Sequence, residues 1–344
     1  MIKNSKKIIF VTEHPAPYWD EAFLLLDKYC DLTVIYIQEF VKSKPWKNYK
    51  YFPGIFYCEK LKLIKTIFQA NHIIIGGYYR KELRNIILFS ILFQKKISLF
   101  TDVQKNYQRN PFKSILKKVL FMNFSFFFVS GRKGIKYLNE TYNISKKKLM
   151  YLPYAYSKPV QNNPIKQISF DKLNILISSR FEKRKGHEVL VSALKKSQKK
   201  VLNNCHFIFL GDGKLKNDIN LKLNKINFLS FEMLGWIGIN SYYEYLSKCN
   251  VLIHPSYFEP FGIPVIDSLN RGLIVIASDG VMSAYDFIDD SHNGFIYQNN
   301  SCDELASKMA FLVDNKSSLK SISEKAKSTI PDYEFYLKKI IDFL

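Results

Sequence analysis

The sequence predicts an α/β protein built from two doubly wound domains. Short apolar runs rich in Ile, Val, Phe and Tyr alternate with stretches of helical length, and one polar, proline-containing segment interrupts the alternation. A length of 344 residues exceeds one typical core and suits two domains. Apolar residues make up 47% of the chain, enough to fill two cores and to argue against disorder.

Six strands are expected in the first half, because continuous apolar runs of this length are typical of buried parallel strands. They cover residues 7–13, 32–37, 72–78, 96–102, 125–131 and 148–155. Stretches of helical length lie between most of them, for example at 20–30, 80–93 and 110–124. We therefore expect the first domain to span residues 1–158.

Residues 159–171 are polar and contain two prolines, which predicts a linker. The alternation then resumes in a second domain, expected at 172–328. Its predicted strands are 173–179, 206–213, 228–236, 251–256 and 273–279. The tail 329–344 has helical periodicity, and we expect it to pack back toward the first domain.

Charge is distributed unevenly along the chain. The net charge is +21, of which residues 1–160 carry +18. A basic half beside a nearly neutral half suggests that one half meets an anionic surface. A plainer origin stays open, because Lys, Asn, Ile, Phe and Tyr are all abundant, as AT-rich coding of a low-GC bacterium would produce.

The five cysteines and six histidines follow no metal-ligand spacing. Scattered cysteines without a CxxC pair are typical of buried thiols in a reducing cytosol. The longest apolar runs fall short of the roughly 20 residues that a membrane-spanning helix needs. We therefore expect a cytoplasmic protein without a metal site.

Two acids, Glu259 and Asp267, stand in the apolar segment that follows the strand predicted at 251–256. In a parallel sheet, ligands bind in the crevice beyond the carboxyl ends of the strands, and Glu259 is expected to face it. A helix is expected at 262–271, and Asp267 lies about one turn inside it.

The start of that helix predicts an anion site. Pro264 suits an early helix position and Gly272 suits the stop. The free N–H groups near Gly262 and Ile263 then point at the crevice. One anion site flanked by two acids suits a phosphorylated polyol.

The first strand of the second domain ends in a cationic segment. Arg180 and Lys185 stand there, just before Gly186, and two cations at such a junction suit a pyrophosphate. A solvated charge run is the plainer alternative. Gly211 and Gly213 indicate a tight turn at the end of the next strand.

Several motifs occur in the order seen in family 4 (group 1) glycosyltransferases of the GT-B fold. They are SRFEKRKGHEVLVSAL, FIFLGDGKL, LGWIGINSYYEYLSKCNVLIHPSYFEPFGIPVIDSLNRGLIVIASD and NGFIY. The chain resembles this family over nearly all of residues 172–315, and more weakly through HPAPYWDEAF, IIIGGYY and LPYAYS. The resemblance implies two Rossmann-like domains facing a central cleft, the first for the acceptor and the second for the donor.

The resemblance also implies roles for these residues. Arg180 and Lys185 would bind the donor diphosphate, and Glu259 would contact the donor sugar. The backbone of Phe261, Gly262 and Ile263, with the turn at Gly211 and Gly213, would approach the donor. The acid at position 267 would hold the nucleotide ribose.

Two departures from the family pattern concern the same site. Asp267 stands where the family usually has Glu, which keeps the acceptor oxygens but shortens their reach. The first domain has no clear match to the histidine that many members place near the reacting sugar. His14 and Asp102 are the acceptor-side or cleft candidates, and for His14 an ordinary loop residue is the alternative.

The expected function is a metal-independent, retaining transfer of a hexosyl group from a nucleotide diphosphate sugar to a glycan or lipid-linked acceptor, in bacterial surface polysaccharide biosynthesis. No cofactor is expected beyond the sugar nucleotide, and no nucleic-acid-binding pattern is present. A catalytically silent relative that binds sugar nucleotide or a partner enzyme remains the alternative.

The segments 42–57 and 110–124 combine cations with aromatic residues, and 110–124 predicts a basic amphipathic helix that suits an anionic bilayer. A peripheral position at the inner face of the cell membrane is therefore the working hypothesis. An ordinary core-facing helix with a Lys-rich outer face is an equal alternative for 110–124.

Overall fold

The computed structural model describes residues 6–38, 50–102, 111–156 and 170–344, with the side chains of 111–113 excepted. The structure separates into two units, and each is described by itself. Unit 1 comprises Met1–Ala155 and Asp332–Leu344, and unit 2 comprises Tyr156–Pro331. Most of the predicted linker lies outside the described residues. Residues 332–344, most of the tail predicted at 329–344, belong to unit 1. The predicted end of the second domain, residue 328, falls in the last turn of a helix of unit 2.

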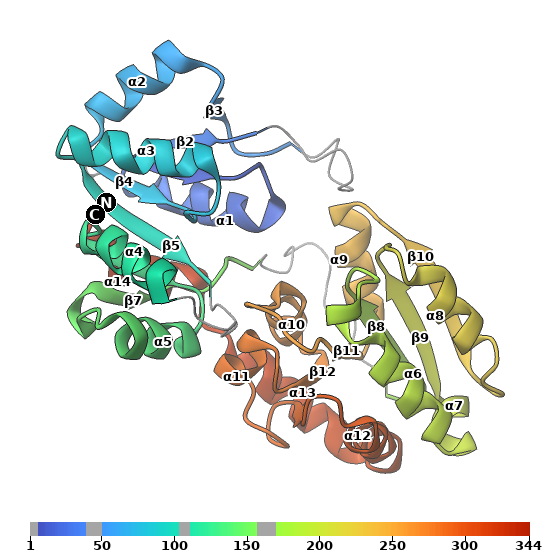
Figure 1. The fold of residues 1–344 in the computed structure, drawn as a ribbon. Helices are drawn as coiled ribbons and strands as arrows, with labels where there is room; N and C mark the ends of the chain where they lie inside the picture. The colour runs from blue at the N-terminus through green and yellow to red at the C-terminus, as the bar shows by residue number, and fades with distance from the viewer. Residues whose placement is uncertain (1–5, 39–49, 103–110, 157–169) are drawn as a thin grey trace. The chain divides into compact units, whose positions relative to one another are not determined.

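Unit 1 is built on a seven-stranded parallel sheet with the order β3-β2-β1-β4-β5-β6-β7 (Figure 1). Its strands are β1 (Lys7–Thr12), β2 (Asp31–Tyr36), β3 (Gly54–Phe56), β4 (His72–Ile75), β5 (Lys96–Thr101), β6 (Phe126–Val129) and β7 (Leu149–Tyr151). Its helices are α1 (Pro17–Leu26), α2 (Lys60–Gln69), α3 (Lys81–Leu92), α4 (Pro111–Met122), α5 (Arg132–Tyr142), the 3-10 turn η1 (Lys146–Lys148) and α14 (Tyr333–Ile341). The edge strand β3 was not predicted, because three residues around a glycine make no apolar run.

One face of this sheet is covered by α2, α3, α4 and α5, whose apolar sides share a core with alternate strand residues. Helix α1 connects β1 to β2, and this connection runs along the sheet in the direction opposite to those that contain α2, α3, α4 and α5. Because crossovers between parallel strands are right-handed, α1 covers the other face of the sheet. Helix α14 packs with α1. The Tyr29 hydroxyl donates to the Glu334 carboxylate, and the Phe126 and Phe343 rings meet at 5.3 Å.

Unit 2 is built on a six-stranded parallel sheet with the order β10-β9-β8-β11-β12-β13. Its strands are β8 (Leu173–Ser178), β9 (Cys205–Leu210), β10 (Ser230–Gly235), β11 (Val251–His254), β12 (Ile274–Ser278) and β13 (Phe295–Tyr297). Its helices are η2 (Lys183–Lys185), α6 (His187–Lys196), α7 (Lys199–Asn204), α8 (Lys216–Leu223), α9 (Ile239–Lys248), α10 (Ile263–Leu269), α11 (Met282–Phe287), α12 (Cys302–Asp314) and α13 (Lys316–Thr329). Both sheets are thus parallel and doubly wound, as the alternation predicted.

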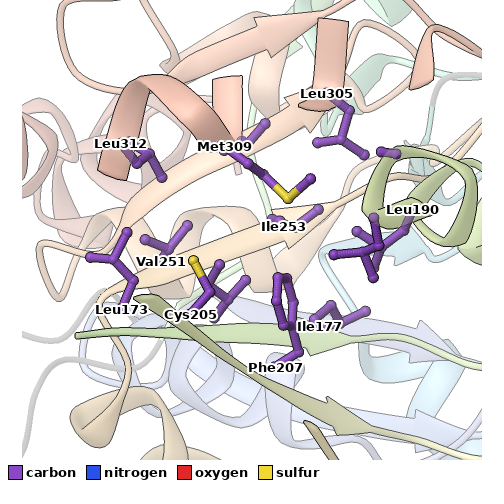
Figure 2. Close-up of a cluster of buried hydrophobic side chains, with 14 of the residues drawn as sticks. Leu173, Ile177, Leu190, Cys205, Phe207, Val251, Ile253, Leu305, Met309 and Leu312 are labelled. Atoms are coloured by element: carbon purple, nitrogen blue, oxygen red, sulfur yellow. The ribbon is translucent and has the colours of Figure 1, made fainter. Parts of the chain in front are cut away.

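The central strands of unit 2 are apolar on both faces, as a sheet covered by helices on both sides requires. Figure 2 shows one of its cores, where Leu173, Ile177, Phe207 and Val251 of the strands meet Met309 and its neighbours on α12. This rigid sheet sets the positions of the loops at its carboxyl edge, the edge at which its strands end.

Candidate functional site

The loop after β8 carries the cationic segment, and a glycine fixes its path. Gly186 adopts a left-handed conformation with φ of 70°. A Cβ atom there would overlap the carbonyl oxygen of Pro255, which follows β11. Backbone contact between the β8 and β11 loops therefore demands glycine. This contact brings the cationic segment to the loop that holds Glu259.

Lys185 and Glu259 form a buried ion pair at this junction, with Lys185 only 8% exposed. The Arg184 guanidinium adds a second cation, with Nη1 3.5 Å from Glu259 Oε2. Nε2 of His254, the last residue of β11, lies 4.0 Å from the same oxygen. The site thus has one acid at the centre of three basic side chains.

The ionisation of this cluster follows from its burial and its charges. Burial alone would raise the pKa of Glu259, but Lys185, His254 and Arg184 outweigh it and hold the pKa below its usual range. Burial lowers the pKa of Lys185, and the Glu259 carboxylate only partly opposes this effect. Burial also lowers the pKa of His254 to about 4, so this ring is neutral at pH 7. Arg184 Nε also lies 3.7 Å from Glu182 Oε2, so the three cations Lys185, Arg184 and Arg180 stand against two carboxylates and leave a surplus of one positive charge.

Arg180 is placed differently. Its side chain is half-exposed, and its Nη1 lies 2.9 Å from Glu182 Oε1. An exposed pair of this kind contributes little to stability, so the guanidinium is available to an incoming anion.

The glycines of the β9 turn also have a packing role. Cβ atoms at Gly211 and Gly213 would overlap the carbonyl oxygens of Ser179 and Phe181. The turn at 211–213 therefore supports the backbone that carries Arg180. Whether it also touches the donor stays a prediction.

Gly262 ends the loop that begins at Glu259 and has φ of 101°. The Ser283 hydroxyl donates to its carbonyl oxygen at 2.9 Å, and the Phe261 side chain is buried. The approach of the Phe261–Ile263 backbone to a ligand stays a prediction. Helix α10 spans Ile263–Leu269, two residues shorter at its end than expected.

Asp267 projects from α10 toward α9 and is only 3% exposed. The Tyr242 hydroxyl donates to its Oδ2 at 3.2 Å, and Arg271 Nη1 lies 4.0 Å from its Oδ1. Burial, followed by the charge of Asp267, raises the pKa of Tyr242. Tyr242 occupies space that a longer acid at position 267 would need.

The candidates of unit 1 lie at the carboxyl edge of its own sheet. His14 follows β1 and is buried, and Asp102 follows β5. β4 lies between these two strands, so His14 and Asp102 lie at the same edge but not on adjacent strands.

Asp102 is set in aromatic surroundings. Its Oδ1 accepts from the Ser130 hydroxyl at 2.9 Å, and its Oδ2 accepts from the Tyr154 hydroxyl at 3.1 Å. The Tyr18 and Tyr154 rings meet edge to face at 5.5 Å. Burial, followed by the Asp102 charge, raises the pKa of both tyrosines. Asp102 thus lies among aromatic side chains, and the same edge also holds an ion pair, in which Arg80 Nη1 lies 3.0 Å from Glu13 Oε1.

Sequence reasoning missed three residues of these two edges. Arg184 stands in the quoted cationic run, so its charge was visible but its direction was not. Tyr242 and Tyr154 gave no signal, because their carboxylate partners lie 25 and 52 positions away along the chain.

Residues 161–329 match the family described as glycosyl transferases group 1. An uncharacterized glycosyltransferase of Methanocaldococcus jannaschii is 28% identical over 152 residues, 44% of this chain and 41% of that protein. A Campylobacter jejuni α-1,4-N-acetyl-D-galactosaminyltransferase, named for a PP-undecaprenol-linked GalNAc saccharide, is 26% identical over 196 residues, 56% of this chain and 52% of that protein. The chain thus matches about half the length of these curated relatives.

The fold has close counterparts among solved structures. Anabaena HepE in complex with UDP and glucose superimposes with a TM-score of 0.75 at 13% identity, covering 98% of this chain and 99% of that one. The sucrose-phosphate synthase of Thermosynechococcus elongatus gives a TM-score of 0.70 at 14% identity, with 98% of each chain covered. At these identities the likeness establishes the fold alone.

Proposed function

Because residues 161–329 belong to the group 1 glycosyl transferases and the chain has the GT-B fold, we propose that it transfers a sugar from a nucleotide diphosphate sugar to a glycan or lipid-linked acceptor. The observation that carries this proposal is the cluster of the buried Lys185 with Glu259 and the half-exposed Arg184 at the carboxyl edge of unit 2. A cluster with surplus positive charge suits a diphosphate, and its acid suits sugar hydroxyls.

Transfer breaks the bond between the anomeric carbon and the diphosphate oxygen and forms a bond from that carbon to an acceptor oxygen. The electron pair of the broken bond stays on the diphosphate, which also takes up the acceptor proton. Lys185 and Arg180 stabilise the negative charge that develops there. Since α10 has only seven residues, these side chains rather than the helix dipole carry most of this stabilisation.

Glu259 has two roles in this scheme. Without a donor it neutralises Lys185, which keeps a buried cation paired. When a donor phosphate binds beside Lys185 in place of the Glu259 carboxylate, the Glu259 oxygens become acceptors for hydroxyl groups of the donor sugar. Asp267 is proposed to hold the nucleotide ribose, with Tyr242 fixing its carboxylate.

Finer features of the reaction are part of the same proposal. Retention at the anomeric carbon and the hexosyl class follow from the family resemblance. Metal independence is supported by the protein cations, which can neutralise the diphosphate themselves. A role in surface polysaccharide synthesis, at the cytoplasmic side of a membrane, is supported by the relative named for a PP-undecaprenol saccharide. Among the described residues, no helix is long and apolar enough to cross a bilayer.

The proposal is tested with a panel of nucleotide sugars. We expect one of them to raise the melting temperature, because a ligand of the native state alone stabilises it. Lys185→Ala and Arg180→Ala should each reduce donor turnover on the order of 100-fold. The matched control is Lys183→Ala, an exposed lysine of the same cationic run, which should keep wild-type turnover.

Equal turnover in Lys185→Ala and Lys183→Ala would refute the diphosphate assignment. Donor binding without turnover in wild-type protein, across a panel of acceptors, would favour the catalytically silent relative. The departure at Asp267 is the observation that keeps this second candidate.

A further inference from the structure

Three consecutive helices of unit 1 expose large apolar side chains to solvent. Of the nineteen exposed large hydrophobic residues among those described, ten lie on or directly after α2, α3 and α4. We call them the three-helix surface: Leu61, Ile64, Phe68, Leu88, Leu92, Phe93, Ile115, Leu116, Val119 and Met122. Leu61 is 87% exposed and Met122 is 74% exposed, so these side chains serve no core.

The helices that carry this surface are neighbours on one face of the sheet (Figure 1). The Phe68 ring, at the end of α2, meets the Phe93 ring, just after α3, at 4.5 Å. Consecutive crossovers from β4 to β5 and from β5 to β6 place α4 beside α3. The apolar side chains therefore form one surface. Ten exposed apolar side chains gathered on neighbouring helices mark an interaction with another molecule.

The charges around the surface identify its partner. The described side chains of the three helices include seven cations, namely Lys60, Lys62, Lys65, Lys81, Arg84, Lys117 and Lys118. Against these stands one acid, Glu82. Apolar side chains surrounded by lysines match the boundary between the acyl chains and the headgroups of an anionic bilayer.

A second copy of the chain fits this surface poorly. A two-fold interface sets a patch against itself, so the cations of one copy would face those of the other. Like charges brought together in this way cost free energy. An anionic lipid surface meets both the apolar and the cationic side chains favourably.

We infer that the three-helix surface docks unit 1 on an anionic lipid bilayer. The surface involves more than the segment 110–124 singled out from the sequence, because α2 and α3 supply six of its ten apolar side chains. This inference deepens the proposed transfer to a lipid-linked acceptor. It is measured without any sugar, so its failure and that of the transfer reaction are separate results.

The test is flotation of the full chain with vesicles of phosphatidylcholine and phosphatidylglycerol, compared with phosphatidylcholine alone, at about 0.15 M salt. We expect binding to the mixed vesicles and little to the neutral ones. Leu88→Ser with Leu92→Ser should weaken binding about tenfold or more, because each leucine loses its apolar burial. Lys65→Ala with Lys118→Ala should weaken it about 25-fold, at about fivefold for each lysine.

Matched controls come from exposed residues elsewhere. Leu24→Ser on α1 with Leu221→Ser on α8 removes two leucines that are exposed to a similar degree. Lys225→Ala with Lys320→Ala removes two exposed lysines of unit 2. Both controls should bind vesicles as the wild type does. All four double variants should keep wild-type turnover of the donor in vesicle-free buffer.

Three results would overturn the inference. The first is equal binding to neutral and anionic vesicles. The second is equal binding by the Leu88/Leu92 variant and the Leu24/Leu221 control. The third is a dimer without lipid that the Leu88/Leu92 substitutions dissociate, which would assign the surface to self-association.

Discussion

The two units share a doubly wound parallel sheet, yet their carboxyl edges are built from different chemistry. The edge of unit 2 gathers Lys185, Arg184 and Glu259 into one partly buried ionic cluster. The edge of unit 1 surrounds Asp102 with the rings of Tyr18 and Tyr154. The first suits a ligand with several charges, and the second suits a polar ligand with hydroxyl groups and an apolar face. Two units of the same topology can therefore suit two chemically different ligands.

The largest difference should appear at two glycines, Gly186 in unit 2 and Gly77 in unit 1. Gly186→Ala combines a left-handed backbone with overlap of the Pro255 oxygen, so we expect a cost of about 3 kcal/mol. Gly77 also has positive φ, but its added Cβ would lie 3.8 Å from Leu83. Gly77→Ala should therefore cost only about 1 kcal/mol. Urea unfolding of both variants measures the difference, and equal midpoints would contradict the account of the β8–β11 junction.

Acid should destabilise unit 2 more than unit 1. Burial lowers the pKa of His187 to about 3 and that of His254 to about 4, both in unit 2. Burial likewise lowers the pKa of His72 in unit 1 to about 3. Because the unfolded chain takes up these protons near pH 6.5, native stability falls as pH drops from 6.5 toward the folded pKa. His254 alone corresponds to about 3 kcal/mol.

Segment-resolved hydrogen exchange between pH 7 and 4.5, corrected for intrinsic exchange rates, follows the two units separately. We expect His187→Gln to flatten the pH dependence of unit 2. The control His292→Gln, at an exposed histidine of the same unit, should leave it unchanged. Greater acid sensitivity in unit 1 would contradict the prediction.

The acids at the two edges should tolerate an added methylene differently. Asp267 is buried against Tyr242, so Asp267→Glu should cost about 1–3 kcal/mol by overpacking. It should not improve the affinity for the sugar nucleotide that the panel identifies, although Glu is the usual residue of the family. Asp102 is only half-buried, and Asp102→Glu should cost less. Calorimetric melting and titration with that nucleotide test both, and tighter binding by Asp267→Glu would contradict the account of overpacking against Tyr242.

The smallest effect concerns the two tyrosines that hold these acids. Tyr154→Phe and Tyr242→Phe each remove one hydrogen bond to a carboxylate, at a cost of about 1.5 kcal/mol. Only Tyr242→Phe should weaken binding of the sugar nucleotide that the panel identifies, because only Asp267 is proposed to hold the donor. Equal loss of nucleotide affinity in both variants would contradict the distinction between the two edges.

Much of the fold could be predicted from local sequence, because buried parallel strands appear in the sequence as continuous apolar runs. Two short strands could not be predicted in this way. β3 and β13 each have three residues, too few for a run that stands out. The residues proposed to bind the donor were recognisable because Arg180, Lys185 and Glu259 stand in ordered motifs. The pairing of Asp102 with Tyr154 joins residues 52 positions apart, and only the folded sheet brings such residues together.

The return of α14 to unit 1 has a consequence for synthesis on the ribosome. Residues 332–344 are translated after the whole of unit 2, yet they complete the packing beneath α1. Unit 1 must therefore close a loop through an entire second unit before its last helix docks, and contacts this distant in sequence form slowly. Unit 2 is one continuous segment, so its packing needs no residues that are translated after another unit. A nascent chain that stops before residue 332 should thus contain a folded unit 2 and an incompletely packed unit 1.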